Sequence, residues 1–331
     1  MVGIGLILMS FTTSLPMFYL SILFIALGAG GTTSVVTMTA VAIWFKKNVG
    51  LALGIMASGF GAGGALIPVI VFLIDETGWR MTVVILGAGM LLLGIPLSLV
   101  VRDPSEDLEP ATDGAAGAAA AGGKVENPGR KTATFRDMIT SRSFLYLNLV
   151  EAIRMTAITS VVTHLMPYLG SIGMTRASAG AVTAALPLVS IVGRFGFGWW
   201  GDRFDKRIVL AATFFIMSGG LFAFCHVKSF WVLVLFVLLF APGFGGGMVL
   251  RGAMLREYFG MAAFGKMLGI VLWTGSIGGI VGPTLAGWVF DTLGSYTPVW
   301  YGFCALSGAA IFLTMKIRPA VSSRETPPAR P

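Results

Sequence analysis

The sequence predicts an all-α polytopic membrane protein with about ten transmembrane helices in two bundles, four helices followed by six. Three observations predict this fold class: an apolar composition, long uninterrupted apolar runs, and an internal repeat. Of 331 residues, 56% are hydrophobic and only 11% are charged, whereas soluble domains carry about 25% charged residues. Within a bilayer every backbone polar group must be bonded inside its own segment, so long apolar runs are predicted to be helices.

Ten apolar segments follow one another along the chain, and all but the first reach roughly the 20 residues that a crossing needs. They lie at about 1–13, 16–44, 50–74, 81–101, 144–168, 178–200, 208–226, 229–255, 265–289 and 296–316. Residues 102–143 are acidic, then rich in Ala and Gly, then basic, a composition that cannot form a packed core. We expect a flexible cytosolic linker there, ending in a short helix within residues 135–143.

An internal repeat sets the expected domain organisation. A shift of 215 residues superposes Leu53-Gly54-Ile55 on Leu268-Gly269-Ile270, and Pro68 on Pro283. The repeat unit is therefore six helices long, as in membrane proteins built from parallel repeats. We expect residues 144–318 to form a complete six-helix bundle. We expect residues 1–101 to supply the last four helices of the other six-helix bundle.

Two further helices are then expected to be encoded upstream of Met1; a native ten-helix protein is the alternative. Residues 319–331 are expected to be a cytosolic tail. Glycine clusters at 59–64 and 243–247 are expected to allow close helix packing, because small residues let transmembrane helices approach.

The basic residues gather on one side of the predicted helices. Connections on that side contain Lys46, Lys47, Arg102 through Arg142, Arg203, Lys206, Arg207, Arg256, Lys266 and Lys316. The other side contains only Arg80, Arg176 and Lys228. The positive-inside rule puts the first side, with the linker and the C-terminus, in the cytoplasm of a plasma or inner membrane protein. The sequence has no basic patch with interleaved aromatic residues that would indicate nucleic-acid binding. The two cysteines lack the spacing of a metal site. We predict no cofactor and no metal.

A charged loop joins the sixth and seventh segments, in the stretch GRFGFGWWGDRFDKR at 193–207. It resembles the signature loop of the major facilitator superfamily of secondary transporters, G-x-x-x-D-R-x-G-R-R. The matching residues are Gly198, Asp202, Arg203, Lys206 and Arg207. Asp205 stands where that pattern has Gly. Because Asp tolerates the left-handed backbone better than most residues, we expect the turn to survive. An ordinary positive cytoplasmic loop is the alternative interpretation.

The stretch WFKKNVGLALGIMASG at 44–59 is similar to a motif of the monocarboxylate porter branch, which includes oxalate/formate antiporters. The matching residues are Phe45, Lys46, Lys47, Leu51, Ala52, Gly54 and Gly59, while Asn48 departs from a usual basic residue. The resemblance implies a major-facilitator-type two-bundle fold. It also implies secondary active transport of small organic anions, monocarboxylates or dicarboxylates, by alternating access. A proton or a counter-anion is then a further partner, and the transporter is expected to be a monomer. A non-transporting receptor or assembly subunit, a different solute class, and a membrane enzyme are the alternatives; no catalytic motif supports the enzyme.

Four charged residues fall inside predicted spans, where a charge costs about 2.5–3.5 kcal/mol or more. Glu151 and Arg154 lie three residues apart, hence on one helix face, and can form a pair. Arg194 corresponds to the intramembrane Arg of the carboxylate porters, which the resemblance makes a substrate ligand; snorkelling to the interface is the alternative. We expect Arg194, Arg154 and Glu151 to form the substrate site, since guanidinium offers a planar fork of donors to a carboxylate.

The fourth charge, Arg251, lies five residues before Arg256. We expect Arg251, Arg256 and Glu257 to form a cytoplasmic gate. The signature loop is expected to act as a hinge or latch, with Asp202 facing the positive end of a helix dipole. The porters often carry Asp four residues before the intramembrane Arg; this chain has Ser190 there, which argues against proton coupling at that position.

Overall fold

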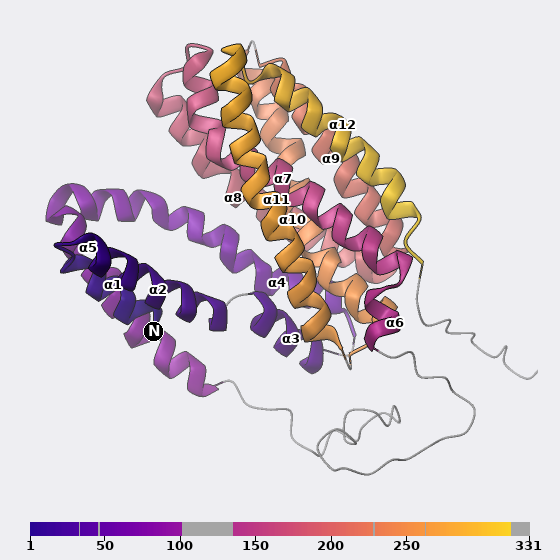
Figure 1. Cartoon of the computed structure of the whole chain (residues 1–331), viewed down its shortest axis with the longest axis horizontal. Coiled ribbons are helices and arrows are strands. Elements are labelled where there is room, and N and C mark those ends of the chain that lie inside the picture. Colours follow the sequence, from indigo (N-terminus) through magenta and orange to yellow (C-terminus); the bar gives the residue numbers. More distant parts are fainter. Residues whose placement is uncertain (33, 46, 101–134, 228, 262, 319–331) are drawn as a thin grey trace, which may run out of the picture.

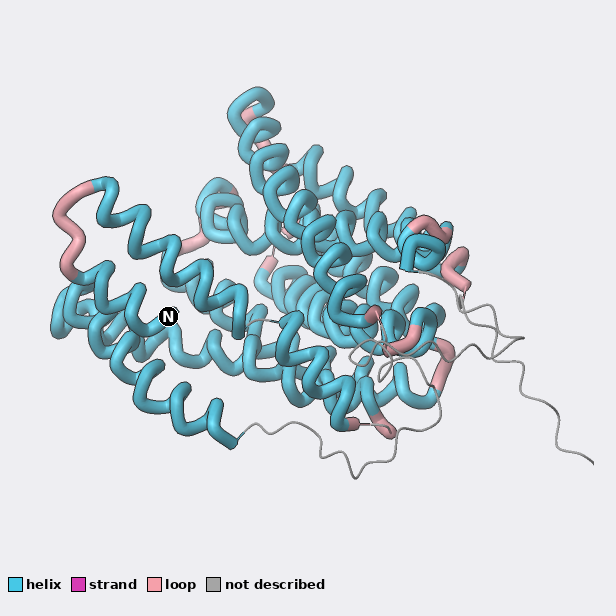
Figure 2. Tube along the Cα trace, turned by 60° about the horizontal axis from the view of Figure 1, so that its bottom comes forward, coloured by secondary structure: helices cyan, strands magenta, loops and turns pink. Residues whose placement is uncertain are grey.

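The computed structural model describes residues 1–32, 34–45, 47–100, 135–227, 229–261 and 263–318. In this part of the chain every regular element is a helix (Figure 1, Figure 2). The elements are α1 (Val2–Ser10), α2 (Leu15–Thr32), α3 (Ser34–Trp44), α4 (Val49–Ala62), the 3-10 helix η1 (Gly63–Leu66), α5 (Ile67–Val100), α6 (Phe135–Ile139), α7 (Arg142–Ser171), α8 (Arg176–Arg203), α9 (Lys206–Cys225), α10 (Phe230–Phe259), α11 (Phe264–Leu293) and α12 (Thr297–Met315). Eight spans among the described residues are long and apolar enough to cross a membrane. The predicted all-α fold is confirmed.

Helices α7 to α12 form one bundle in the C-terminal half. Within it α7 packs against α11, α10 against α8 and α9, and α12 against α9. In the N-terminal half α1 packs against α2 and α5, whereas α4 lies against α8 and α10 (Figure 1). The main contact between the two halves is therefore made by α4, and this contact positions the charged residues considered below.

The large apolar side chains divide between the interior and the outer surface. Trp300, Phe236 and Phe240 are completely buried, whereas Leu92, Phe215 and Phe312 are at least 70% exposed. An outer surface this apolar suits lipid rather than water. Length, hydropathy and this surface make the chain a multi-pass membrane protein.

The repeat is visible in the backbone. Helix α4 begins at Val49 and α11 at Phe264, 215 residues later. Glycines with positive φ follow within one residue of corresponding points: Gly294 (φ 66°) ends α11 and Gly78 (φ 78°) interrupts α5. The start of α4 and the break at Gly78 thus have counterparts in α11 and its end, whereas the η1 interruption has none, because α11 is continuous from Phe264 to Leu293.

One expectation about helix continuity is wrong. Residues 50–74 do not form a single helix, because η1 separates α4 from α5. Pro68 has no N–H to bond to the carbonyl of Gly64, and glycine is the residue that best tolerates such an interruption. The expected linker at 102–143 lies largely outside the described residues, but α6 occupies the stretch where a short helix was predicted.

Candidate functional site

Four charged side chains are buried within the described residues, and all belong to the C-terminal bundle. They are Glu151 and Arg154 on α7, Arg194 on α8 and Arg251 on α10, none more than 4% exposed. Three were predicted to form the substrate site, and the fourth was predicted at the cytoplasmic gate. The structure therefore groups Arg251 with the intramembrane cluster and separates it from Arg256 and Glu257.

Glu151 lies at the centre of this cluster. It accepts hydrogen bonds from Arg154 on its own helix, from Nε to Oε2 at 2.9 Å and from Nη2 to Oε1 at 2.6 Å. Its Oε1 also accepts a bond from Nη1 of Arg251 on α10. The predicted pairing of Glu151 with Arg154 is confirmed. One carboxylate thus holds two guanidinium groups and ties α7 to α10.

Arg194 has a different environment. Its guanidinium faces the ring of Phe244, with Cζ 5.5 Å from the ring centroid. Its Nε and Nη1 atoms are buried and have no hydrogen-bond partner. Because the residue is only 2% exposed, it does not snorkel to the interface. Ser190, one turn earlier, bonds to the carbonyl of Pro187 at 2.6 Å and supplies Arg194 with no counter-charge.

A short segment of α10 positions both Arg194 and Arg154. Nη1 of Arg154 donates to the Phe244 carbonyl at 3.4 Å. A Cβ atom added to Gly245 would lie 2.2 Å from the carbonyl oxygen of Ser190 and 3.2 Å from Cγ of Arg194, and one added to Gly247 would lie 2.9 Å from Cδ of Arg154. Glycine at these two positions gives the arginine side chains room beside α10. From the sequence these glycines were expected only to allow helix packing, and no pattern in the sequence singles out Phe244.

Asp202 joins the two halves of the chain. Its carboxylate accepts hydrogen bonds from the backbone N–H of Gly50 at 2.7 Å and of Leu51 at 2.8 Å, in the first turn of α4. Asn48, the N-cap residue of α4, has φ 53° and makes no side-chain cap of its own. A residue from the other half therefore caps this helix. The prediction that Asp202 faces the positive end of a helix dipole is confirmed.

Arg256 makes a complementary contact at the same end of the molecule. Its Nη1 donates to the carbonyl of Phe45 at 2.5 Å, just beyond the last residue of α3. A cation at a helix C-terminus is favourable for the same electrostatic reason as an anion at an N-terminus. Charged residues of the C-terminal half thus hold the α3–α4 connection where α3 ends and where α4 begins. Arg203 and Lys206 lie at the same end of the molecule, which we call the basic end.

The α8–α9 turn differs in one respect from expectation. Asp205 has φ −57° and acts as the N-cap of α9, accepting from the backbone N–H of Arg207 at 2.9 Å. The left-handed backbone expected there is wrong, because a capping acid replaces the glycine turn. The Arg207 side chain also bonds to Asp205 and lowers the pKa of that carboxyl to about 2. Lys206 pairs with Glu257, so Glu257 binds within its own half.

Helices α4 and α8 touch backbone to backbone near the basic end. A Cβ atom on Gly50 would lie 2.4 Å from the carbonyl oxygen of Gly198, and one on Gly54 would lie 2.5 Å from that of Arg194. Both distances are shorter than any contact a real Cβ makes. Gly54 and Gly198, which match the two family motifs, and the neighbouring Gly50 therefore let the halves close on each other.

The remaining motif residues lie away from this contact. Arg203 stacks on Trp199 with Cζ 3.9 Å from the ring centroid. Lys47 is exposed, and Gly59 has open space where a Cβ would stand. Lys46 lies outside the described residues.

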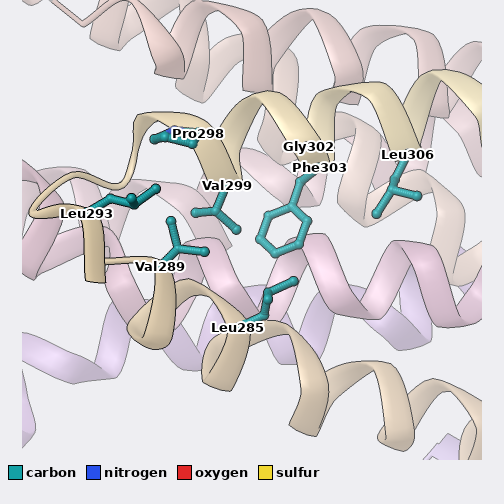
Figure 3. Close-up of a pocket in the computed structure, with 8 residues that line it drawn as sticks. All are labelled: Leu285, Val289, Leu293, Pro298, Val299, Gly302, Phe303 and Leu306. Atoms are coloured by element: carbon teal, nitrogen blue, oxygen red, sulfur yellow. The ribbon is translucent and has the colours of Figure 1, made fainter. Parts of the chain in front are cut away.

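An apolar groove lies between α11 and α12 (Figure 3). It has a volume of about 250 Å³. Figure 3 labels the residues that line it: Leu285, Val289, Leu293, Pro298, Val299, Gly302, Phe303 and Leu306. None of these side chains is charged, so the groove is separate from the charged cluster.

Comparison with known proteins agrees with this architecture. The chain is 28% identical to monocarboxylate transporter 12 of Rattus norvegicus, with 98% of the chain and 71% of the relative aligned. It is 26% identical to monocarboxylate transporter 13 of Bos taurus, with 95% and 71% aligned.

Solved structures share the fold. The E. coli fucose:proton symporter matches with a TM-score of 0.70 and 16% identity, covering 96% of this chain and 81% of the other. The human organic anion transporter MFSD10 matches with a TM-score of 0.71 and 15% identity, covering 95% and 74%. The family model of the Major Facilitator Superfamily matches residues 1–175 and 149–331. The chain belongs to the Major Facilitator Superfamily, a family of membrane transporters.

Proposed function

We propose that this chain is a secondary active transporter of small organic anions that works by alternating access, with Arg194 as the anion-binding residue. The observation that carries the proposal is the Arg194 guanidinium, which is buried with two N–H groups unbonded. A buried charge without a partner costs several kcal/mol. A substrate carboxylate that accepted a charge-assisted hydrogen bond from either of these atoms would offset this cost.

The position of Arg194 supports the same proposal. A Cβ atom on Gly61 of α4 would lie 2.5 Å from Nη1 of Arg194, and the Phe244 ring of α10 covers the guanidinium from within the C-terminal bundle. The side chain therefore lies between the two halves of the chain. Alternating access requires a substrate site between the two halves, because a site there is exposed to one side of the membrane at a time. The names of the relatives, monocarboxylate transporters 12 and 13, agree with an anionic substrate.

The gate in this proposal is the contact between α4 and α8 at the basic end. Asp202 and Arg256 hold the α3–α4 connection by its two helix ends. We propose that this end faces the cytoplasm of a plasma or inner membrane, which the positive-inside rule supports. Separation of the α3–α4 connection from α8 and α10 would break both contacts and open the site to the cytoplasm. Arg256 is then a gate residue, as predicted from the sequence, while Arg251 belongs to the binding site.

Uptake of a labelled carboxylate such as lactate into proteoliposomes tests the proposal. Arg194→Ala is expected to abolish uptake. Arg194→Lys keeps a charge but loses the planar fork, so binding is expected to weaken by about tenfold or more. Arg176→Ala, at the exposed start of the same helix, is the matched control and should transport normally. Uptake by Arg194→Ala at the rate of the unmodified chain would contradict the proposed site.

A further inference from the structure

The charges of the buried cluster do not balance. Arg154, Arg194 and Arg251 contribute three positive charges and Glu151 one negative charge, a formal net charge of +2 among the buried residues that the structure describes. We infer that the preferred substrate carries two negative charges, as a small dicarboxylate does, so that the occupied cluster is neutral. This inference rests on the proposed function and specifies the substrate class of the same site.

The unbonded donors are divided between two places. Arg194 has free Nε and Nη1 atoms on the α8 side, and Arg251 has a free Nε atom on the α10 side. Arg154 lies next to both other arginines, because it shares Oε1 of Glu151 with Arg251 and contacts Phe244 as Arg194 does. Both of its bonds to Glu151 are already formed. The cluster is therefore one contiguous positive region that offers donors at two separate points.

Glu151 neutralises only one of the two arginines it binds. Arg154 and Arg251 share the same oxygen, Oε1, so one positive charge remains on that side of the cluster. The second positive charge is that of Arg194. A substrate with a single carboxylate on Arg194 leaves the first charge uncompensated in a site of low dielectric, where charge interactions are strong. A second carboxylate directed at the Arg154–Arg251 side removes this imbalance.

Binding of two acids with the same carbon chain separates the possibilities. Succinate and butyrate each have four carbons and differ in one carboxylate, and isothermal titration calorimetry of the purified chain in detergent at pH 7 measures the dissociation constant (Kd) of each. Succinate is expected to bind tighter by about tenfold or more. Equal or tighter binding of butyrate would overturn the dianion inference and leave the proposed anion transport standing. Binding of neither acid would contradict the anion site, and with it the proposed function.

Two variants that change the net charge of the cluster in opposite directions test whether this charge causes the preference for succinate. Arg251→Gln lowers the formal charge of the cluster from +2 to +1, so the Kd ratio of butyrate to succinate is expected to fall toward one. Glu151→Gln raises it to +3, so the ratio is expected to stay the same or rise. Arg176→Gln, exposed on α8, should leave the ratio unchanged. A fall of the ratio in both cluster variants would indicate loss of structure and would overturn the charge argument.

Discussion

Replacing Asp202 with Asn is expected to open the basic end of the molecule without unfolding it. The carboxylate accepts two backbone N–H groups of α4, at 2.7 and 2.8 Å. Asn removes the negative charge from both contacts, and its amide has one oxygen, so one of the two N–H groups loses its acceptor. The charge–dipole contribution is about 0.3–1 kcal/mol when exposed and up to about 2 when partly buried. We expect a net loss of about 1–2 kcal/mol, which shifts the closed-to-open ratio about 5- to 30-fold.

Distance measurement by double electron–electron resonance reads this shift directly. Spin labels at exposed Lys47 and Phe204 report the separation of the α3–α4 connection from the α8–α9 turn. The two free cysteines, Cys225 and Cys304, are replaced by Ser beforehand. Asp202→Asn is expected to enlarge the long-distance population while its helical content stays constant.

The control is Asp205→Asn, because Asp205 bonds within its own half and should leave the distances unchanged. Unchanged distances in Asp202→Asn would refute the capping argument. An equal shift in Asp205→Asn would show that any charge change in the loop has the same effect.

Three further predictions concern stability and closure. Gly54→Val should prevent closure of the basic end, because even its Cβ would stand 2.5 Å from the Arg194 carbonyl; labelling of Lys47→Cys and transport assays check this, and transport at the normal rate would contradict it. Glu151→Ala should lower the free energy of unfolding by about 3–5 kcal/mol, because two buried guanidinium groups lose their carboxylate; thermal unfolding in detergent measures it, and an unchanged Tm would contradict it. Arg207 holds the pKa of Asp205 at about 2. The ionised Asp205 carboxylate therefore stabilises the fold at pH values above the ordinary Asp pKa near 3.8, and this stabilisation is lost as the pH falls toward 2. Asp205→Asn should therefore unfold at a lower temperature than the unmodified chain at pH 5, and the difference should shrink near pH 2; a constant difference would contradict this assignment.

Much of the site could be predicted because the sequence marks rare events. A charged residue inside an apolar run stands out, and this singled out Glu151, Arg154, Arg194 and Arg251 before any contact was known. The helix spacing of three residues predicted the pairing of Glu151 with Arg154. No such periodicity relates Arg251 to Glu151, which lie 100 residues apart on different helices. Arg251 was assigned to the gate because Arg256 lies close to it in the sequence. In the fold, Arg251 joins the buried cluster and Arg256 does not.

Local rules failed where a contact came from the other half. Nothing in the α4 sequence supplies its cap, since Asn48 makes no cap bond, and the cap comes from Asp202 far along the chain. The interruption at Gly63–Leu66 was also missed, and no local signal indicates it, because the same pattern of Gly278-Gly279 and Pro283 lies inside the continuous helix α11.

Composition, apolar runs and the 215-residue repeat determined the class of fold, because the bilayer leaves a long apolar run no alternative to a helix. Charge asymmetry indicated the orientation in the membrane, and the two motifs pointed to the transporter family. The tertiary structure alone decided which charges meet. It gave Glu151 two arginines, left Arg194 without a counter-charge, and placed Asp202 on the end of α4. Each of these depends on the approach of helices distant in sequence, and close backbone contacts at glycines, not any local pattern, set that approach.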